Sequence, residues 1–209
     1  MKTLQTIDEL YLTEHHHLTS DDECYYLTTY TSGAGYEYSD DNDLMSNFKK
    51  DVNRKGKSEW KYKEDAIKEY ARMLQEVNLT EVFGNDITIV PVPPSKVKTD
   101  VLYDDRLNQV LQLAFDDGSI DIKELVLQQS STESSHSSEK RLSIEALKDN
   151  YYIDETLCAD IKSTILIVFD DMITAGAHYK AMKEILEDRF PDKKIIFLGL
   201  ARRSTVYKQ

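Results

Sequence analysis

Two adjacent acids, Asp170 and Asp171, have the residue types and spacing most informative about chemistry in this chain. They follow an apolar, β-branched run at 163–169 that predicts a buried strand, and they precede a small-residue turn at 174–177. Carboxylates accept hydrogen bonds from vicinal hydroxyls, whereas turn amides and a helix N-terminus bind phosphate. Because open α/β sheets bind ligands beyond the carboxyl ends of their strands, the pattern suits a sugar phosphate.

Two clusters near the N-terminus offer other chemistry. The triplet His15–His17 invites a metal site, but no Cys or acid accompanies it at ligand spacing. We expect a solvated loop or a core contact there. The alternative that one of these histidines faces the ligand stays open. Tyrosines crowd residues 25–38, where a half-buried hairpin with a turn at Ser32–Gly35 is favoured over an aromatic platform for a base.

Alternating strand and helix patterns must position the acid pair. Besides the run at 163–169, the patterns predict strands at 87–93 and 194–201, helices at 61–78, 106–115, 141–150 and 176–190, and a short strand or helix end at 122–127. This order predicts an α/β protein with an open parallel sheet flanked by helices.

Two irregular segments suggest how the chain is organised. The run Gly84–Asp86 breaks the helical pattern, so we place a boundary there between an N-terminal hood or attachment at 1–84 and an α/β core at 85–209. Six of the twelve residues at 128–139 are serine, which predicts a mobile segment. It reads as a linker or as a lid over the ligand, and its place between two expected site strands favours the lid.

Composition bounds the class of protein. The 209 residues are 40% hydrophobic, enough for one core with or without a smaller attachment, and the net charge is −12. That charge argues against direct nucleic-acid binding, which needs a basic face. No apolar run reaches about 18 residues, the N-terminus lacks a secretory h-region, and Cys24 and Cys158 lie far apart. We therefore expect a cytoplasmic protein without membrane spans or a disulfide framework.

The motif Asp170-Asp-x-x-Thr-x-Gly-Ala177 resembles the phosphoribosyl-pyrophosphate (PRPP) signature of type I phosphoribosyltransferases. Within that family the closest resemblance is to the ComF-like group, without its cysteine-rich zinc module. Four segments between 85 and 209 carry it: Val90–Pro93 at the entry to the pyrophosphate loop, Arg106–Gln109 at a helix start, Thr132 with Glu139–Arg141 in the flexible loop, and Leu198–Arg202 in the last strand.

The resemblance implies a role for each matching residue. Asp170 and Asp171 would bind the ribose 2- and 3-hydroxyls, and Arg106 and Arg141 would neutralise the leaving pyrophosphate. The implied phosphate ligands are the 5-phosphate turn Thr174, Ala175, Gly176, Ala177 and His178, and the pyrophosphate-loop residues Ser95 and Lys96. Mg²⁺ would reach the site through the ligand rather than through protein ligands of its own.

Departures from the family pattern leave two functions open. Ala175 and His178 replace hydroxyl residues of the phosphate turn, Asp104-Asp105 makes the mouth acidic, and the glutamine of the flexible loop is missing. One function is a Mg²⁺-dependent phosphoribosyltransferase. The other is a non-catalytic PRPP or nucleotide sensor, an accessory to DNA uptake or to defence against mobile elements. Residues 1–84 would supply a partner surface, and an open sheet of this kind is compatible with a homodimer.

Overall fold

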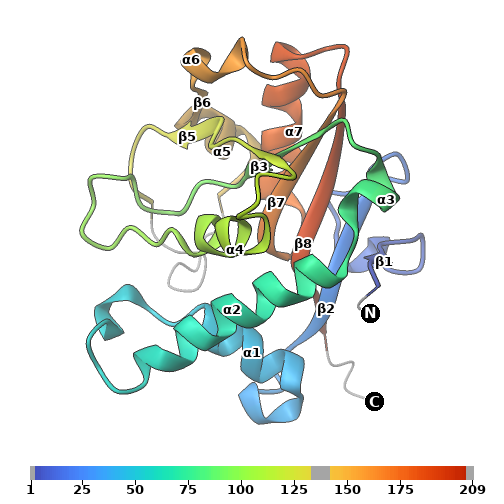
Figure 1. Ribbon diagram of the computed structural model, residues 1–209. Helices are drawn as coiled ribbons and strands as arrows, with labels where there is room; N and C mark the ends of the chain where they lie inside the picture. The colour runs from blue at the N-terminus through green and yellow to red at the C-terminus, as the bar shows by residue number, and fades with distance from the viewer. Residues whose placement is uncertain (1–2, 133–141, 206–209) are drawn as a thin grey trace.

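The computed structural model describes residues 3–132 and 142–205 (Figure 1). The strands are β1 (Gln5–Thr6), β2 (Cys24–Ser32), β3 (Ile87–Pro91), β4 (Asp121–Ile122), β5 (Val126–Gln128), β6 (Tyr151–Ile153), β7 (Ile165–Ile173) and β8 (Lys194–Thr205). The α-helices are α1 (Asp40–Phe48), α2 (Trp60–Glu76), α3 (Leu79–Phe83), α4 (Arg106–Ala114), α5 (Ile144–Asn150), α6 (Glu155–Cys158) and α7 (Ala177–Arg189), with 3-10 turns η1 (Leu12–Glu14), η2 (Tyr36–Tyr38) and η3 (Val52–Arg54).

The main sheet has six strands in the order β1-β2-β8-β7-β3-β4. Its neighbours run parallel except β1 and β2, which are antiparallel. Strands β5 and β6 form a separate antiparallel pair. The predicted α/β class with a mostly parallel sheet is confirmed.

Strand β7 lies in the middle of this sheet, between β3 and β8. Its residues Leu166, Ile167, Val168 and Phe169 are fully buried. A strand covered on both faces must be apolar along its length, which is why the run 165–169 does not alternate. The carboxyl ends of β7, β3 and β8 lie at the same edge, where the acid pair stands.

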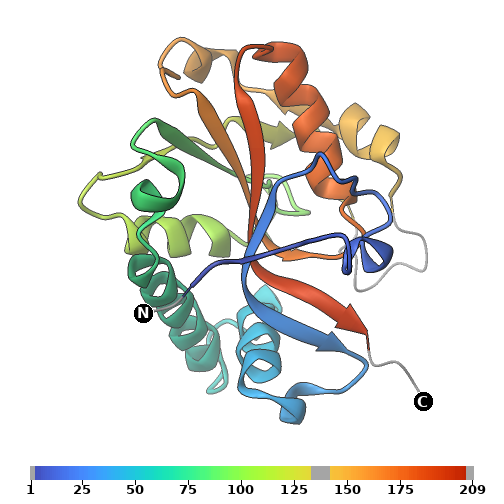
Figure 2. The same cartoon turned by 90° about the vertical axis from the view of Figure 1, so that its right-hand side faces the viewer.

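Helices cover both faces of the sheet (Figure 2). One core cluster packs α1, α2 and α4 against one face, and the other packs α5 and α7 against the opposite face. The predicted apolar stripe of α2 is confirmed: Ala66, Ile67, Tyr70, Met73 and Leu74 are all buried.

The N-terminal segment differs from the prediction. Tyr25–Tyr30 is a strand, but its long partner is β8, which runs parallel at eight paired positions, so the predicted hairpin is wrong. The glycines after it lead into η2 and α1 instead of a returning strand. Consequently the main sheet crosses the expected boundary near residue 84, since β1 and β2 belong to the same sheet as the core strands.

Several predicted ranges change locally. The segment 122–127 divides between β4 and β5, and β8 extends to Thr205. Helix α5 begins at Ile144 because the Ser143 side chain caps it by accepting from the Ala146 amide. The expected lid lies outside the described residues apart from 128–132. Within the described ranges, no helix combines the length and apolar character needed to cross a membrane.

Candidate functional site

Asp170 and Asp171 lie within the last four residues of β7, which continues to Ile173 instead of ending before the acids as predicted. Their environments differ. Successive side chains of a strand point to opposite faces, and here one face carries α1 and α4 while the other carries α7. Asp171 is 6% exposed, whereas Asp170 is partly exposed. The backbone N–H of Asp171 donates to Asp170 Oδ1 at 2.7 Å, which fixes the Asp170 carboxylate close to the strand.

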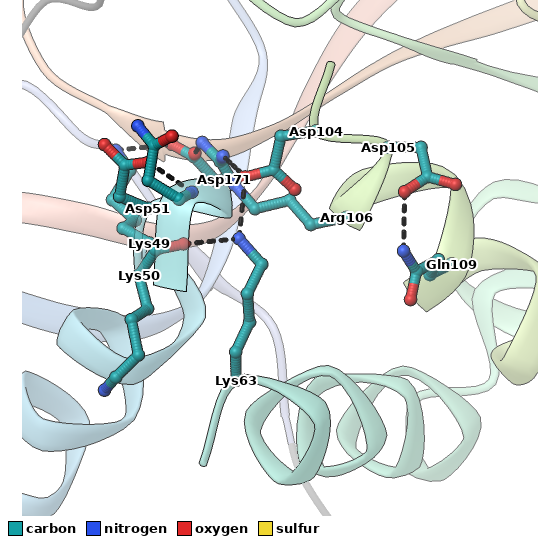
Figure 3. Close-up of polar contacts among 10 residues, drawn as sticks. Lys49, Lys50, Asp51, Lys63, Asp104, Asp105, Arg106, Gln109 and Asp171 are labelled. Atoms are coloured by element: carbon teal, nitrogen blue, oxygen red, sulfur yellow. Dashed lines mark hydrogen bonds and ion pairs between the residues drawn. The ribbon is translucent and has the colours of Figure 1, made fainter. Parts of the chain in front are cut away.

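Two cations hold Asp171. Lys49, directly after α1, places its Nζ 2.9 Å from Oδ1, and Arg106, the first residue of α4, places Nη2 2.5 Å from Oδ2 (Figure 3). Both carboxylate oxygens are therefore engaged. Because Lys49 and Arg106 come from elements on the same face of the sheet, Asp171 ties α1 and α4 to the end of β7.

The ion pairs continue through Asp104. Its Oδ2 accepts from Arg106 Nη1 at 2.6 Å and from Lys63 Nζ at 2.6 Å. The Lys63 side chain is 1% exposed, and its ammonium also donates to the Lys50 carbonyl at 2.8 Å. Buried charges persist only when they are paired and hydrogen-bonded. Asp104, which we expected to make the entrance of the ligand site acidic, thus links α2 to α4 through these ion pairs.

The two acids have opposite pKa shifts. Burial, reinforced by the charge of Asp171, raises the pKa of Asp170 to about 7. Burial also opposes ionisation of Asp171, but Lys49 and Arg106 outweigh it and hold the pKa of Asp171 below its usual range. Asp171 is therefore ionised at neutral pH, whereas Asp170 exchanges a proton there.

The turn after β7 is braced from behind by the His15–His17 segment. His15 Nδ1 contacts the Thr174 carbonyl, and the backbone N–H of His17 donates to the Ala175 carbonyl at 3.0 Å. In a trans peptide the carbonyl and the following N–H point in opposite directions. Holding these two carbonyls therefore turns the N–H groups of Ala175 and Gly176 away from the histidines.

Helix α7 begins beyond this turn without a side-chain cap. Gly176 has φ +94° and serves as the N-cap, and the first backbone N–H groups of the helix have no intrahelical acceptor. Uncapped amides at a helix N-terminus suit an anion. The carbonyls of the predicted phosphate turn are thus hydrogen-bonded by the histidine segment, whereas the first amides of α7 have no intrahelical acceptor.

His178 lies in the first turn of α7, and its Nδ1 is 2.7 Å from the hydroxyl of Tyr151. Burial lowers the pKa of His178, so the imidazole is neutral at pH 7. Burial, followed by the charge of Asp170, raises the pKa of the Tyr151 phenol. The phenol is therefore protonated, and the pair presents neutral donors and acceptors beside the phosphate turn.

The other expected ligand residues lie apart from this centre. Ser95 and Lys96 follow β3, where Lys96 Nζ donates to the Thr132 carbonyl at 2.9 Å and the Thr132 amide donates to the Ser95 carbonyl at 2.7 Å. The loop is thereby bonded to the start of the serine-rich segment. Arg141 lies outside the described residues.

Sequence reasoning missed Lys49 and Lys63 and did not foresee the role of the histidines. A signal for Lys63 was present: it occupies the same helical stripe as Ile67 and Tyr70, and a lysine on a buried stripe needs a counter-charge. Lys49 carried no such signal, because its position follows the end of α1. In the described residues no three His, Cys, Asp or Glu side chains converge in a way that could hold a metal ion.

Comparison with known proteins adds no assignment. No protein-family model matches this chain, and no curated protein matches its sequence.

Proposed function

We propose that this protein binds PRPP, or a related ribose 5-phosphate ligand, with Mg²⁺ at the carboxyl end of β7, and transfers the phosphoribosyl group. One observation carries the proposal: a carboxylate with free lone pairs, Asp170, stands next to a braced turn whose amides lead into an uncapped helix. A sugar phosphate needs acceptors for its hydroxyls and donors for its phosphate within one short span of chain. The segment 170–178 supplies both.

Different residues bind different parts of the ligand. The amides of 175–178 and the neutral His178 hold the 5-phosphate, and Asp170 accepts from a ribose hydroxyl. Arg106 neutralises charge on the pyrophosphate, and its buried Nε has no acceptor among the described residues, so it keeps a donor for a ligand oxygen. Bound Mg²⁺ supplies further neutralisation of the pyrophosphate oxygens.

The reaction is a displacement at C1 of the ribose. The bond from C1 to the pyrophosphate oxygen breaks, a bond from C1 to a nitrogen nucleophile forms, and the nitrogen loses a proton. The carbon passes through an oxocarbenium-like state, so alignment and stabilisation of the leaving group matter more than a covalent intermediate. Asp170, which exchanges a proton near neutral pH, is the group beside the sugar suited to take that proton.

The second candidate function is a non-catalytic PRPP or nucleotide sensor that works with a partner protein. The engagement of Asp171 favours it, because both oxygens of that carboxylate are taken by Lys49 and Arg106. A ligand that needs Asp171 must displace these ion pairs and with them the contact between α1 and β7. Such a displacement would report occupancy to the N-terminal segment.

Calorimetric titration with PRPP and MgCl₂, beside ribose 5-phosphate and AMP, tests the proposal. We expect micromolar binding of PRPP that Asp170→Asn abolishes and Asp188→Asn, on the exposed end of α7, leaves unchanged. Absence of heat with all three ligands contradicts the binding proposal. Release of pyrophosphate in the presence of a panel of bases then separates the two functions, since a sensor binds PRPP without turnover.

A further inference from the structure

A cavity of about 250 Å³ borders the first turn of α4. Arg106 reaches Asp171, whereas its neighbours Leu107 and Asn108 line the cavity. None of the residues 170–178 contributes to its wall. The cavity is therefore a separate space, although α4 borders both.

The walls are largely apolar. Val92 and Pro93 extend from the end of β3, Val126 and Leu127 come from β5, and Val97 closes the space from the loop above. Apolar walls with a few polar groups are typical of sites for small organic molecules. The volume lies just below the range for drug-sized ligands, roughly 300–1,000 Å³, which restricts the occupant to one or two rings.

One end of the cavity is rich in hydrogen-bond acceptors. Glu124 accepts from Lys98 and from the side-chain amide of Asn108. Because a carboxylate only accepts, the NH₂ of Asn108 must face Glu124, and its Oδ1 is left as an acceptor. That Oδ1 is buried and has no donor among the described residues. A buried acceptor without a partner costs about 1–3 kcal/mol, so a ligand N–H placed there would be favoured.

Aromatic rings line the same space. Tyr103 and Tyr152 both border the cavity, and Tyr152 is 43% exposed. Flat rings at the mouth of a narrow apolar space favour a flat occupant through offset or edge contacts. Two acids, Glu124 and Asp105, and two lysines, Lys96 and Lys98, line the same walls. The formal charges of the lining balance, and a charged occupant would be buried without a counter-charge of its own, so an uncharged occupant is favoured.

The roof of the cavity is held in place. Gln128 donates to the Pro94 carbonyl, and the Val97 amide donates to the Ser131 hydroxyl oxygen at 3.1 Å. The Thr132 amide adds a bond to the Ser95 carbonyl at 2.7 Å. The loop that carries Ser95 and Lys96 thus forms a preformed wall, and an occupant would pack directly beneath it.

We propose that this cavity binds an uncharged, flat heteroaromatic molecule of one or two rings that donates an N–H to Asn108 and Glu124. This site is additional to the proposed ribose-phosphate site and does not depend on it. Because residues of the loop 94–99 line the cavity, an occupant would contact that loop directly.

Ligand-observed saturation-transfer NMR tests the proposal with 2-aminopyrimidine and adenine as donor-bearing probes, and pyrimidine and benzoate as controls. We expect saturable binding of the two donor-bearing probes in the millimolar range typical of fragments, about tenfold weaker binding of pyrimidine, and none of benzoate. Val97→Trp fills the cavity from the loop, and Asn108→Leu removes the acceptor. Each should weaken 2-aminopyrimidine at least about tenfold, the loss expected when a buried polar contact is removed.

The matched control is Leu113→Trp, which adds the same ring at a position in α4 that is 46% exposed and does not line the cavity. It should bind like the native protein. Circular dichroism confirms that each variant is folded, and the two cavity variants provide independent tests. Absence of saturable binding by both donor-bearing probes, or unchanged binding in folded Val97→Trp, overturns the proposal. Asp170→Asn should still bind the probes but should no longer bind PRPP. The experiment therefore distinguishes failure of the cavity proposal from failure of the PRPP proposal.

Discussion

At the scale of single residues, the fold imposes opposite demands on two neighbours of the same type. Asp171 is bound on both oxygens by cations, so its charge is part of the structure. Asp170 accepts a backbone N–H from Asp171, and its pKa is raised because burial and the neighbouring charge disfavour ionisation. An ionisable group that the fold buries at a cost in stability is a candidate for function, because functional sites often sacrifice stability.

Replacing Asp170 by Asn should therefore stabilise the protein at pH 8. The pKa of Asp170 is about 7 in the folded chain and about 3.9 when unfolded, so its contribution to stability is fully present below about pH 4 and lost as pH rises through 7. Asn does not titrate, and we expect a gain of about 1–3 kcal/mol at pH 8 that shrinks at pH 5. Urea unfolding at both pH values measures it. A variant less stable than the native protein at pH 8 would contradict the shift.

Replacing Asp171 by Asn should do the reverse. It leaves Lys49 and Arg106 without their shared counter-charge, and breaking a buried ion pair costs about 3–5 kcal/mol. Both cations keep some exposure, so we expect a loss of about 3 kcal/mol at pH 7 by urea unfolding. Lys49→Met combined with Asp171→Asn should recover part of that loss. If Asp171→Asn proves as stable as the native protein, the cations do not need this partner.

The residue scale also shows where sequence reasoning stops. The acid pair and the small turn could be placed from local order, because a strand, its carboxyl end and the next helix are contiguous. The partners of Asp171 could not, since Lys49 and Arg106 lie 122 and 65 positions away and only the packing of α1 and α4 brings them together. In the sequence, Asp104 is interpreted as a departure from the family pattern that makes the entrance of the site acidic. In the structure it forms ion pairs with Lys63 and Arg106.

At the scale of elements, the turn after β7 depends on a segment far from it in sequence. Leu18 packs beside Gly176, where an added Cβ would lie 2.7 Å from Leu18 Cδ2. The same segment holds the carbonyls of Thr174 and Ala175. The open amides of the proposed phosphate turn are thus a consequence of N-terminal packing rather than of the turn sequence alone.

Gly176→Ala should separate this packing from simple backbone strain. The φ of +94° costs about 1–2 kcal/mol for any residue with a Cβ, and the clash with Leu18 adds to it. Gly33→Ala is the matched control, because Gly33 has φ +83° and nothing within 4 Å of an added Cβ. We expect Gly176→Ala to lose at least about 1 kcal/mol more than the control in urea unfolding, as one additional strained contact would.

The excess should disappear in a Leu18→Ala background, which removes the clashing atoms. Equal losses for the two glycine variants with Leu18 present would show that the turn relaxes without cost. The phosphate affinity of Gly176→Ala should fall along with its stability, since the amides depend on the same backbone.

Element prediction succeeded where periodicity was strong. Strands β3 and β7 and helices α2, α4 and α7 lie within a few residues of their predicted bounds. Strand β2 was also predicted, but its partner was not. Local patterning marks a strand without saying which strand it pairs with, and the glycines after Ser32 suggested a return that the chain makes as η2 and α1.

At the scale of the whole molecule, the two ends of the chain share one sheet. β2 and β8 pair at eight positions, from Cys24 with Phe197 to Ser32 with Thr205. α2 packs its apolar stripe into the same core cluster as residues of β3, β7 and β8. The candidate site follows this plan, since Lys49 and the histidine segment come from residues 1–84 and the acid pair from the core.

If the chain is divided after Gly84, we therefore expect the two fragments to fold together but not separately. Gly84 is exposed, and nothing lies within 4 Å of an added Cβ there, so the break itself removes little. The fragment 85–209 alone loses the parallel neighbour of β8 and helix α2, whose buried stripe belongs to the same core cluster as Ile167 and Phe169. Unpaired strand edges and uncovered apolar faces favour aggregation over folding. We expect no cooperative thermal transition by circular dichroism from either fragment alone.

An equimolar mixture of the fragments 1–84 and 85–209 should restore the transition and elute as a one-to-one complex, because the missing strand and helix return together. The same mixture should also recover PRPP binding, since the 1–84 fragment restores the contacts of His15 and His17 with the carbonyls of Thr174 and Ala175. A sharp thermal transition from 85–209 alone would instead mean that the core is an independent domain, with residues 1–84 attached to it. The ion pair between Lys49 and Asp171 would then be a contact between domains, and its loss on ligand binding could free the N-terminal segment for a partner.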